Sequence, residues 1–145
     1  MSHPYFDCYL IPVATDKLAA YKRFSQQMMA VYVEYGAVRI TDCILDPATT
    51  DGTQFHAEAA QDHLQASTLR DFPTAADTQS GETVILSWTE WPSKAIRDAA
   101  LPRVLADPRV QPKPGEDMIF DGSRLISGGF FHFASLGRVD TTQNG

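Results

Sequence analysis

The side chains best suited to catalysis or ligand binding lie in one apolar run, where Trp88 and Glu90 are two residues apart. If this run is a β-strand, the two side chains share a face, because alternate residues of a strand point the same way. A carboxyl group beside an indole ring loses water, which raises its pKa and suits it to act as a general base. The rival interpretation is a structural ion pair between this carboxylate and a basic side chain, for which the candidates are Lys94, Arg97 and Arg124.

Three further residues are candidates for a site. His132 is the histidine placed in an apolar segment, so it is a second candidate catalytic residue and the candidate for a haem ligand; a hydrogen-bonded structural histidine is the alternative. Arg39 and Arg124 could bind an anionic group of a ligand, although arginines at a sheet edge are commonly only solvated. Arg39, Arg124 and Trp88 form the predicted ligand-binding set.

The sequence context of His56, His63 and the two cysteines favours structural roles over chemical ones. His56 and His63 are seven residues apart, whereas metal-binding pairs on helices usually use a spacing of four, so we expect no metal site. Cys8 has an acid and a tyrosine as neighbours, and neither would lower the pKa of its thiol. Cys8 and Cys43 each fall in an apolar segment, which favours free thiols in a reducing compartment over a disulfide. We expect no cofactor.

Composition limits the class of protein. A chain of 145 residues with 43% hydrophobic residues fits one domain with a sizeable core. A net charge of −6 without a clustered basic run opposes binding to nucleic acid or to an anionic membrane surface. No apolar run approaches the ~20 residues that span a bilayer, and the start of the chain lacks the pattern of a signal peptide. We therefore expect a cytoplasmic protein.

The spacing of apolar residues, together with capping and helix-breaking residues, predicts the helices and strands. Apolar residues at helical spacing predict a helix over 16–35, with Thr15 as its N-cap and Gly36 closing it. Ser93 is the predicted cap of a second helix, in which Pro102 should cause a kink or a break. Strands are predicted at 5–13, 37–45, 84–91 and 125–133, and a thin amphipathic helix at 55–69.

The order strand, helix, strand, excursion, strand, helix, strand predicts an α+β fold, a ferredoxin-like βαββαβ sandwich with a four-stranded antiparallel sheet. This domain spans residues 1–136, with a peripheral insertion at 53–67 and a flexible tail at 137–145. Both helices of that fold cover one face of the sheet. Apolar residues occupy both faces of the predicted strands, so the second face needs another cover, and the same face of another copy is self-complementary about a two-fold axis. We expect a homodimer.

Several collinear motifs resemble the YbaA-like family, domain of unknown function 1428. They are EYGAVRI at 34–40, SWTEWPSK at 87–94, RDA at 97–99, DPR at 107–109, MIFDGSR at 118–124, Ile126 and GGF at 128–130. The resemblance implies the dimeric α/β-barrel superfamily, in which two ferredoxin-like sheets face each other and enclose cavities. That superfamily includes cofactor-independent monooxygenases, haem-degrading enzymes, isomerases and proteins without known activity. The extra residues at 53–67 and Pro102 depart from the family pattern.

These observations predict a homodimer that binds a small, partly apolar molecule in a cavity between the sheet and its partner. A cofactor-independent monooxygenase or isomerase is the enzymatic alternative, and a non-catalytic structural dimer is the other. A pocket into which Glu90 or His132 points would favour catalysis, whereas a filled interface between sheets would favour the structural role.

The insertion at 53–67 gives a first testable prediction. Because a surface loop changes closure entropy only slowly with its length, replacing these residues by a short Gly/Ser link should leave the protein folded and its oligomeric state unchanged. Circular dichroism and size-exclusion chromatography measure both properties. Loss of folded protein would place a core element within 53–67.

Overall fold

The computed structural model of the chain describes residues 3–48 and 70–137, which form an α+β fold around an open, antiparallel, four-stranded sheet. The strands are β1 (Tyr5–Ala14), β2 (Arg39–Ile44), β3 (Glu82–Trp91) and β4 (Ile126–Phe131), and their order across the sheet is β2-β3-β1-β4. The helices are α1 (Leu18–Glu34), α2 (Phe72–Ala75) and α3 (Lys94–Ala106), with 3₁₀ turns η1 (Thr15–Lys17), η3 (Pro108–Val110) and η4 (Gly122–Arg124).

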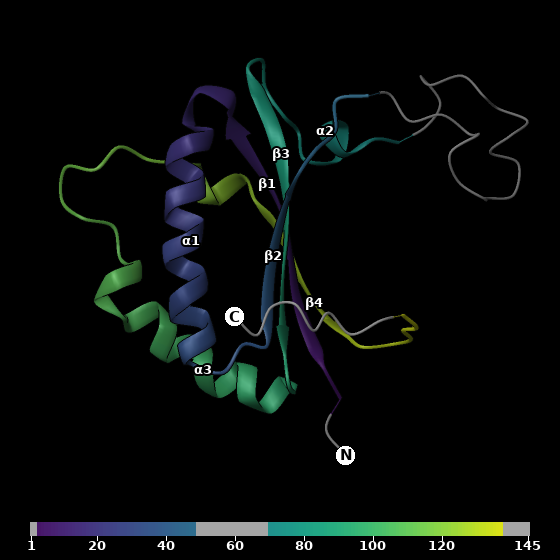
Figure 1. Cartoon of the computed structure of the whole chain (residues 1–145). Helices are drawn as coiled ribbons and strands as arrows, with labels where there is room; N and C mark the ends of the chain where they lie inside the picture. The colour runs from purple at the N-terminus through teal and green to yellow at the C-terminus, as the bar shows by residue number, and fades with distance from the viewer. Residues whose placement is uncertain (1–2, 49–69, 138–145) are drawn as a thin grey trace, which may run out of the picture.

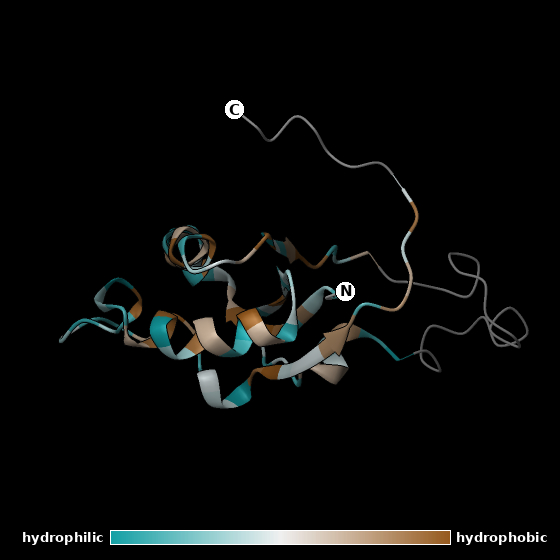
Figure 2. Ribbon diagram, turned by 90° about the horizontal axis from the view of Figure 1, so that it is seen from below, coloured by the Kyte–Doolittle hydropathy of each residue, from teal (hydrophilic) through white to brown (hydrophobic). Residues whose placement is uncertain are grey.

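The two longer helices, α1 and α3, lie on the same side of the sheet, and α2 lies on the other side near the start of β3 (Figure 1). Hydrophobic and hydrophilic residues alternate along the helices, as expected for elements with one face on a core (Figure 2). No helix within 3–48 or 70–137 is long and apolar enough to cross a membrane.

Local signals place most helix ends where the sequence predicts them. Gly36 follows α1 with a φ of 117°, a conformation that glycine adopts without strain. The Ser93 hydroxyl accepts a 3.2 Å hydrogen bond from the Ile96 amide and caps α3. Thr15 as the cap of α1 is wrong: it belongs to η1, and its hydroxyl donates to the Gly81 carbonyl at 3.1 Å.

Of the kink or break predicted at Pro102, the break is wrong, since α3 runs through this residue to Ala106. Ala100 and Val104 are buried against the core on either side, whereas Pro102 is exposed. Water can therefore solvate the carbonyl that loses its amide partner, while the packing on the buried face keeps the helix continuous.

Strand register fixes which residues face the helices. Odd-numbered residues of β1 and β3 point toward α1 and α3, and most of them are buried: Tyr5, Asp7, Ile11, Val13, Ile85, Ser87, Thr89 and Trp91. Even-numbered residues point to the other side, so Trp88 and Trp91 lie on opposite faces of the sheet. Gly129 of β4 lies against the Tyr5 ring, so a Cβ at this position would clash with the tyrosine hydroxyl unless the ring moved.

The predicted helix at 55–69, the insertion at 53–67 and the tail from residue 138 onward lie outside the described residues.

Candidate functional site

The side of the sheet opposite α1 and α3 carries three rows of residues that run from β2 through β3 and β1 to β4. We call the surface formed by these rows the open face. The first row is Arg39, Glu90, Phe6 and Phe130; the second is Thr41, Trp88, Cys8 and Gly128; the third is Cys43, Leu86, Leu10 and Ile126.

Three of the predicted site residues meet on the open face. Trp88 and Glu90 lie in neighbouring rows of β3, as their spacing predicts, and Arg39 is the register partner of Glu90 on β2. The side chains of a directly opposed antiparallel pair stand about 5 Å apart at Cβ, within reach of one ligand. The structure therefore places an indole, a carboxylate and a guanidinium on one end of the same surface.

The expected ion pairs of Glu90 are not formed, because its candidate partners have other acceptors. Lys94 pairs with Asp98 at 2.8 Å, Arg97 pairs with Asp7 at 2.9 Å, and Arg124 pairs with Glu82 at 2.8 Å. Lys94 and Arg97 belong to α3, on the other side of the sheet from Glu90, so strand alternation separates them.

Arg124 lies apart from Trp88, Glu90 and Arg39 and forms a structural clamp with Glu82. Its two terminal nitrogens donate to the Glu82 carboxylate at 2.8 and 2.9 Å, and one also donates to the Asp77 carbonyl at 2.8 Å. Glu82 begins β3, whereas Glu90 lies near the other end of that strand. The clamp joins η4 to the turn before β3.

His132 lies one residue beyond β4, and β1 separates that strand from β3 and Glu90. Its backbone amide donates to the Pro4 carbonyl at 3.0 Å, and its Nε2 lies 3.0 Å from the Ser135 hydroxyl. These hydrogen bonds, at a corner of the sheet, are those expected if His132 is a structural histidine and not a catalytic residue or haem ligand.

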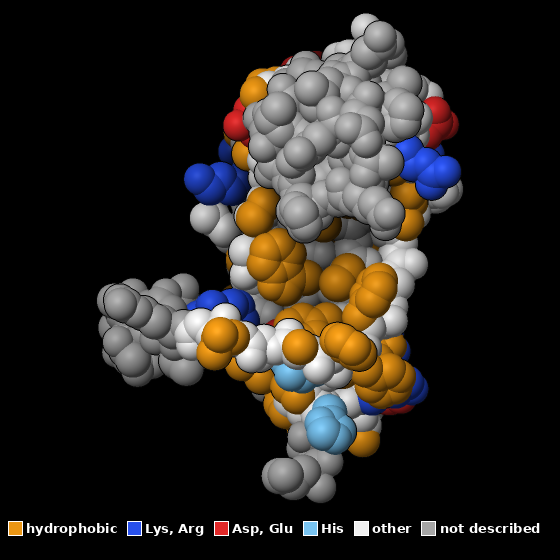
Figure 3. All heavy atoms as spheres, turned by 90° about the vertical axis from the view of Figure 1, so that its right-hand side faces the viewer, with side chains coloured by type: hydrophobic (Ala, Val, Ile, Leu, Met, Phe, Trp, Pro, Cys, Tyr) orange, Lys and Arg blue, Asp and Glu red, His pale blue; other side chains and the backbone are white. Residues whose placement is uncertain are grey.

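The open face combines apolar and aromatic groups with solvent exposure. Leu86 and Trp88 are half-buried, and Phe130 keeps 56% of its surface exposed. Hydrophobic side chains border a hollow on this side of the molecule (Figure 3). Burial, and then the charge of Asp7, raise the pKa of the Cys8 thiol, which keeps it protonated and agrees with its interpretation as a small hydrophobe.

One buried group was missed by sequence reasoning. The Asp7 carboxylate, 3% exposed, accepts hydrogen bonds from Trp91 Nε1 at 3.0 Å and from the Arg97 guanidinium at 2.9 and 3.0 Å. The available signal was an acid at an odd position of β1, on the same face as Ile11 and Val13. A buried charge needs such partners.

A second polar group on the helix side was also missed. Asp42 of β2 accepts a 2.5 Å hydrogen bond from the Ser25 hydroxyl of α1, close to the buried hydroxyls of Ser87 and Thr89. Alternation predicts this placement, since Asp42 has the parity of Ile40, which packs against the core.

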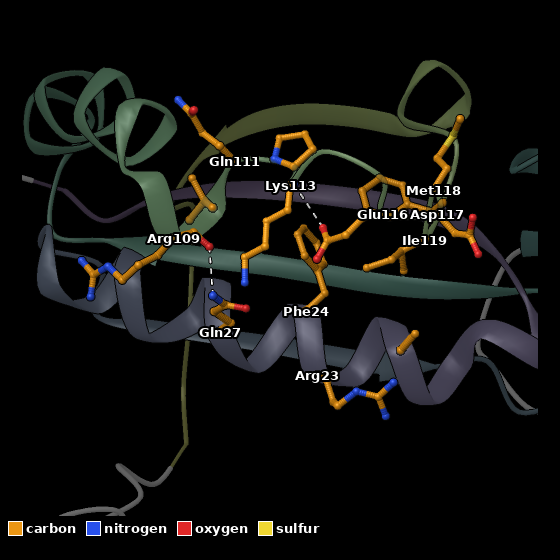
Figure 4. A pocket seen from close by; sticks show the side chains of 14 residues that line it. Arg23, Phe24, Gln27, Arg109, Gln111, Lys113, Glu116, Asp117, Met118 and Ile119 are labelled. Carbon is orange, nitrogen blue, oxygen red and sulfur yellow. Dashed lines mark hydrogen bonds between the residues drawn. The ribbon is translucent and has the colours of Figure 1, made fainter.

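A cavity of about 710 Å³ lies between α1 and the segment that follows α3 (Figure 4). Phe24 and Ile119 supply apolar lining, and the side chains of Gln27 and Lys113 point into it. Gln27 donates to the Arg109 carbonyl at 3.1 Å, which ties the segment to the helix. Phe24 and Phe120 line both this cavity and the smaller one that Asp42 lines, and both cavities lie on the helix side of the sheet.

Within residues 3–48 and 70–137, no cluster of three or more His, Cys, Asp or Glu side chains is placed to hold a metal ion. His56 and His63 lie outside the described residues.

Comparison with known proteins identifies relatives over most of the chain. Residues 4–122 match the family described as Protein of unknown function (DUF1428). The chain is 35% identical over 126 residues to the uncharacterized protein YbaA of Escherichia coli strain K12, which covers 87% of this chain and 93% of that protein. The same identity and coverage hold for the uncharacterized protein YbaA of Shigella flexneri.

The clamp between Glu82 and Arg124 predicts a specific sensitivity to acid. Hydrogen bonds from Arg124 and from the Gln79 amide lower the pKa of Glu82 from 4.5 to about 2. Because the folded pKa is the lower one, the ionised carboxylate stabilises the fold fully above pH 4.5, and this contribution is lost as the pH falls toward 2.

Urea denaturation between pH 7 and pH 2 measures this effect. The midpoint of the native protein should fall more steeply below pH 4.5 than that of Glu82→Gln, which carries no titrating group at this position. Glu116→Gln, a change of the same chemistry on an exposed loop, should follow the native curve. Parallel curves for the native protein and Glu82→Gln would show that the clamp does not stabilise the fold.

Proposed function

Because the chain belongs to the DUF1428 family of proteins of unknown function, we propose its function from the geometry: it is a homodimer that binds a small, partly apolar molecule. The binding cavity forms where the open face of one copy meets that of another. Trp88, Glu90 and Arg39 line one end of this cavity.

The arrangement of elements supports the homodimer. The strand order β2-β3-β1-β4, with α1 and α3 on one side, supports a ferredoxin-like sandwich. In such a sandwich a single chain covers one face of its sheet. Two copies with their open faces together make the closed assembly of a dimeric α/β-barrel, and a two-fold axis lets one surface serve both partners.

The observation that carries the proposal is the composition of the open face. Its central strands present Phe6, Leu10, Leu86 and Trp88, with Ile126 and Phe130 beside them on β4. A contiguous apolar surface of this kind is rare on a soluble monomer and marks a binding surface. Burying a large side chain from water contributes about 1.5–3 kcal/mol, which favours a partner over solvent.

The polar end of the open face defines the ligand chemistry. Arg39 and Glu90 are opposed across β2 and β3, and Trp88 is in the next row. The indole face suits a flat or branched apolar group, while the guanidinium and the carboxylate suit a polar group that both accepts and donates hydrogen bonds. A small molecule with one apolar part and one such polar group fits this end.

A cofactor-independent reaction at Glu90 is the second candidate function. It is favoured by the position of this carboxylate between Arg39 and Phe6, one row from Trp88. Closure by a second copy would exclude water from the carboxylate, which could then accept a proton from a bound substrate, as in an isomerase or a monooxygenase.

Light scattering tests the homodimer. At micromolar concentration the particle mass should be about twice the chain mass of 16.0 kDa. Leu86→Glu puts a charge on the centre of the open face and should yield monomers, because the charge would be buried without a partner. Leu105→Glu makes the same change on α3, where the native leucine is 60% exposed, and should leave a dimer. A native monomer, or a dimer that survives Leu86→Glu, contradicts the proposal.

A thermal-shift screen of small aromatic and branched acids and amides, at fixed protein concentration, tests ligand binding. A ligand at 100 times its Kd stabilises the folded state by about 2.7 kcal/mol and raises the Tm. Trp88→Ala should abolish the shift produced by the best compound. Glu90→Gln should weaken it with little change in the Tm of the free protein.

The design separates a binding residue from a structural one. If Glu90→Gln lowers the Tm of the free protein and leaves the ligand-induced shift intact, Glu90 acts in folding and not in the site. Glu116→Gln, on a loop away from the open face, is the matched control and should change neither quantity.

A further inference from the structure

The hydrophobic core on the helix side of the sheet is divided in two. One cluster contains Tyr5, Ala37, Trp91 and Ala100, and the other contains Ile11, Val13, Tyr21 and Ile85. Between Ile85 and Trp91, the helix-facing residues of β3 are the small polar Ser87 and Thr89. They fill less space than the large residues at either end of the strand. A cavity of about 180 Å³ lies here, under α1.

Five of the fourteen residues that line this cavity are aromatic. Tyr21 and Phe24 of α1 and Phe120 contact one another, with ring centroids 5.8–6.2 Å apart. Tyr9 of β1 and Tyr32 of α1 line it as well. Phe24, Phe120, Tyr9 and Tyr32 are only partly buried, so the rings are not sealed from solvent.

The charge inside this aromatic wall is negative. The Asp42 carboxylate lines the cavity and accepts a hydrogen bond from Ser25, while no Lys or Arg belongs to its described lining. The charge of Arg97 reaches Tyr9 and Tyr32, but Asp7 and Asp98 hold its guanidinium in ion pairs.

The three tyrosines that line the cavity carry no charge. Burial raises the pKa of Tyr9, Tyr21 and Tyr32, so all three stay as neutral phenols at physiological pH. Their ring faces carry the negative part of the aromatic quadrupole, which attracts cations.

We propose that this cavity binds a small organic ammonium ion, with the cationic head against the rings of Tyr21, Phe24 and Tyr32 and its charge balanced by Asp42. Aromatic rings around one carboxylate are the chemistry that recognises quaternary and methylated ammonium groups. The site is distinct from the open face, because the sheet lies between them. The net charge of −6 favours the approach of a cation.

Isothermal titration calorimetry with choline tests the proposal, using as a probe control the uncharged analogue in which carbon replaces the nitrogen. The two molecules have the same shape, so their difference in affinity reports the charge. Choline should bind at least about tenfold more tightly than the analogue, a difference of about 1.4 kcal/mol. Equal affinities, or no heat from choline at millimolar concentration, overturn the proposal.

Two variants assign the binding to this cavity. Asp42→Asn should remove most of the preference for choline, whereas Asp46→Asn, an equal change of charge at an exposed position, should keep it. Phe24→Leu removes a ring but no charge, and it should weaken choline more than the analogue; it also serves if Asp42→Asn does not fold. Unchanged choline affinity in either cavity variant contradicts the assignment.

Trp88→Ala separates this site from the open face. It should leave choline affinity unchanged, because the indole points to the other side of the sheet. If Trp88→Ala alone abolishes choline binding, the ammonium ion binds on the open face and the cavity under α1 is not its site.

Discussion

The buried carboxylate of Asp7 is the interaction on which the arrangement of this protein depends. It joins β1 to Trp91 at the end of β3 and to Arg97 of α3, residues that are 84 and 90 positions away in the chain. Removing one partner from a buried pair of this kind leaves an unpaired charge and costs about 3–5 kcal/mol. A shift of β1 by one residue would turn Asp7 toward the open face and break these bonds. Asp7 therefore selects a single register for the two central strands.

This register decides the chemistry of both sides of the sheet. With Asp7 and Trp91 facing the helices, Ser87 and Thr89 must face them too, and the core is divided by small polar residues. The same register sends Trp88 and Glu90 to the open face beside Arg39. One buried carboxylate thus determines two separate surfaces, the apolar open face opposite α1 and α3 and a cavity with polar and aromatic lining under α1.

The elements were predictable from the sequence because they depend on local signals. The run of β3, the Ser93 cap and the glycine after α1 each act within a few residues, and the structure confirms them. The continuity of α3 through Pro102 was not predictable, because it depends on the burial of Ala100 and Val104, which local propensity does not contain.

The candidate site was predictable in part for the same reason. Alternation along one strand placed Trp88 and Glu90 on one face, but Arg39 and Glu90 are 51 positions apart and become opposed only when β2 pairs with β3. Lys94 and Arg97 failed as predicted partners of Glu90 because the sequence does not reveal which face of the sheet α1 and α3 cover. The Asp7 network and the Asp42 cavity join residues from different elements, so neither appears as a motif.

The central claim is that a second copy covers the open face, and the native thiol of Cys8 reports this directly. Cys8 lies in the middle row of that face and is partly exposed, and Cys43 lies on the edge strand, so a Cys43→Ser variant leaves one reporter. The measurement is the rate of maleimide labelling of Cys8 at fixed pH as the protein concentration increases from nanomolar to micromolar. The account predicts that labelling slows as the faces close on each other. A rate that is the same at every concentration would contradict it.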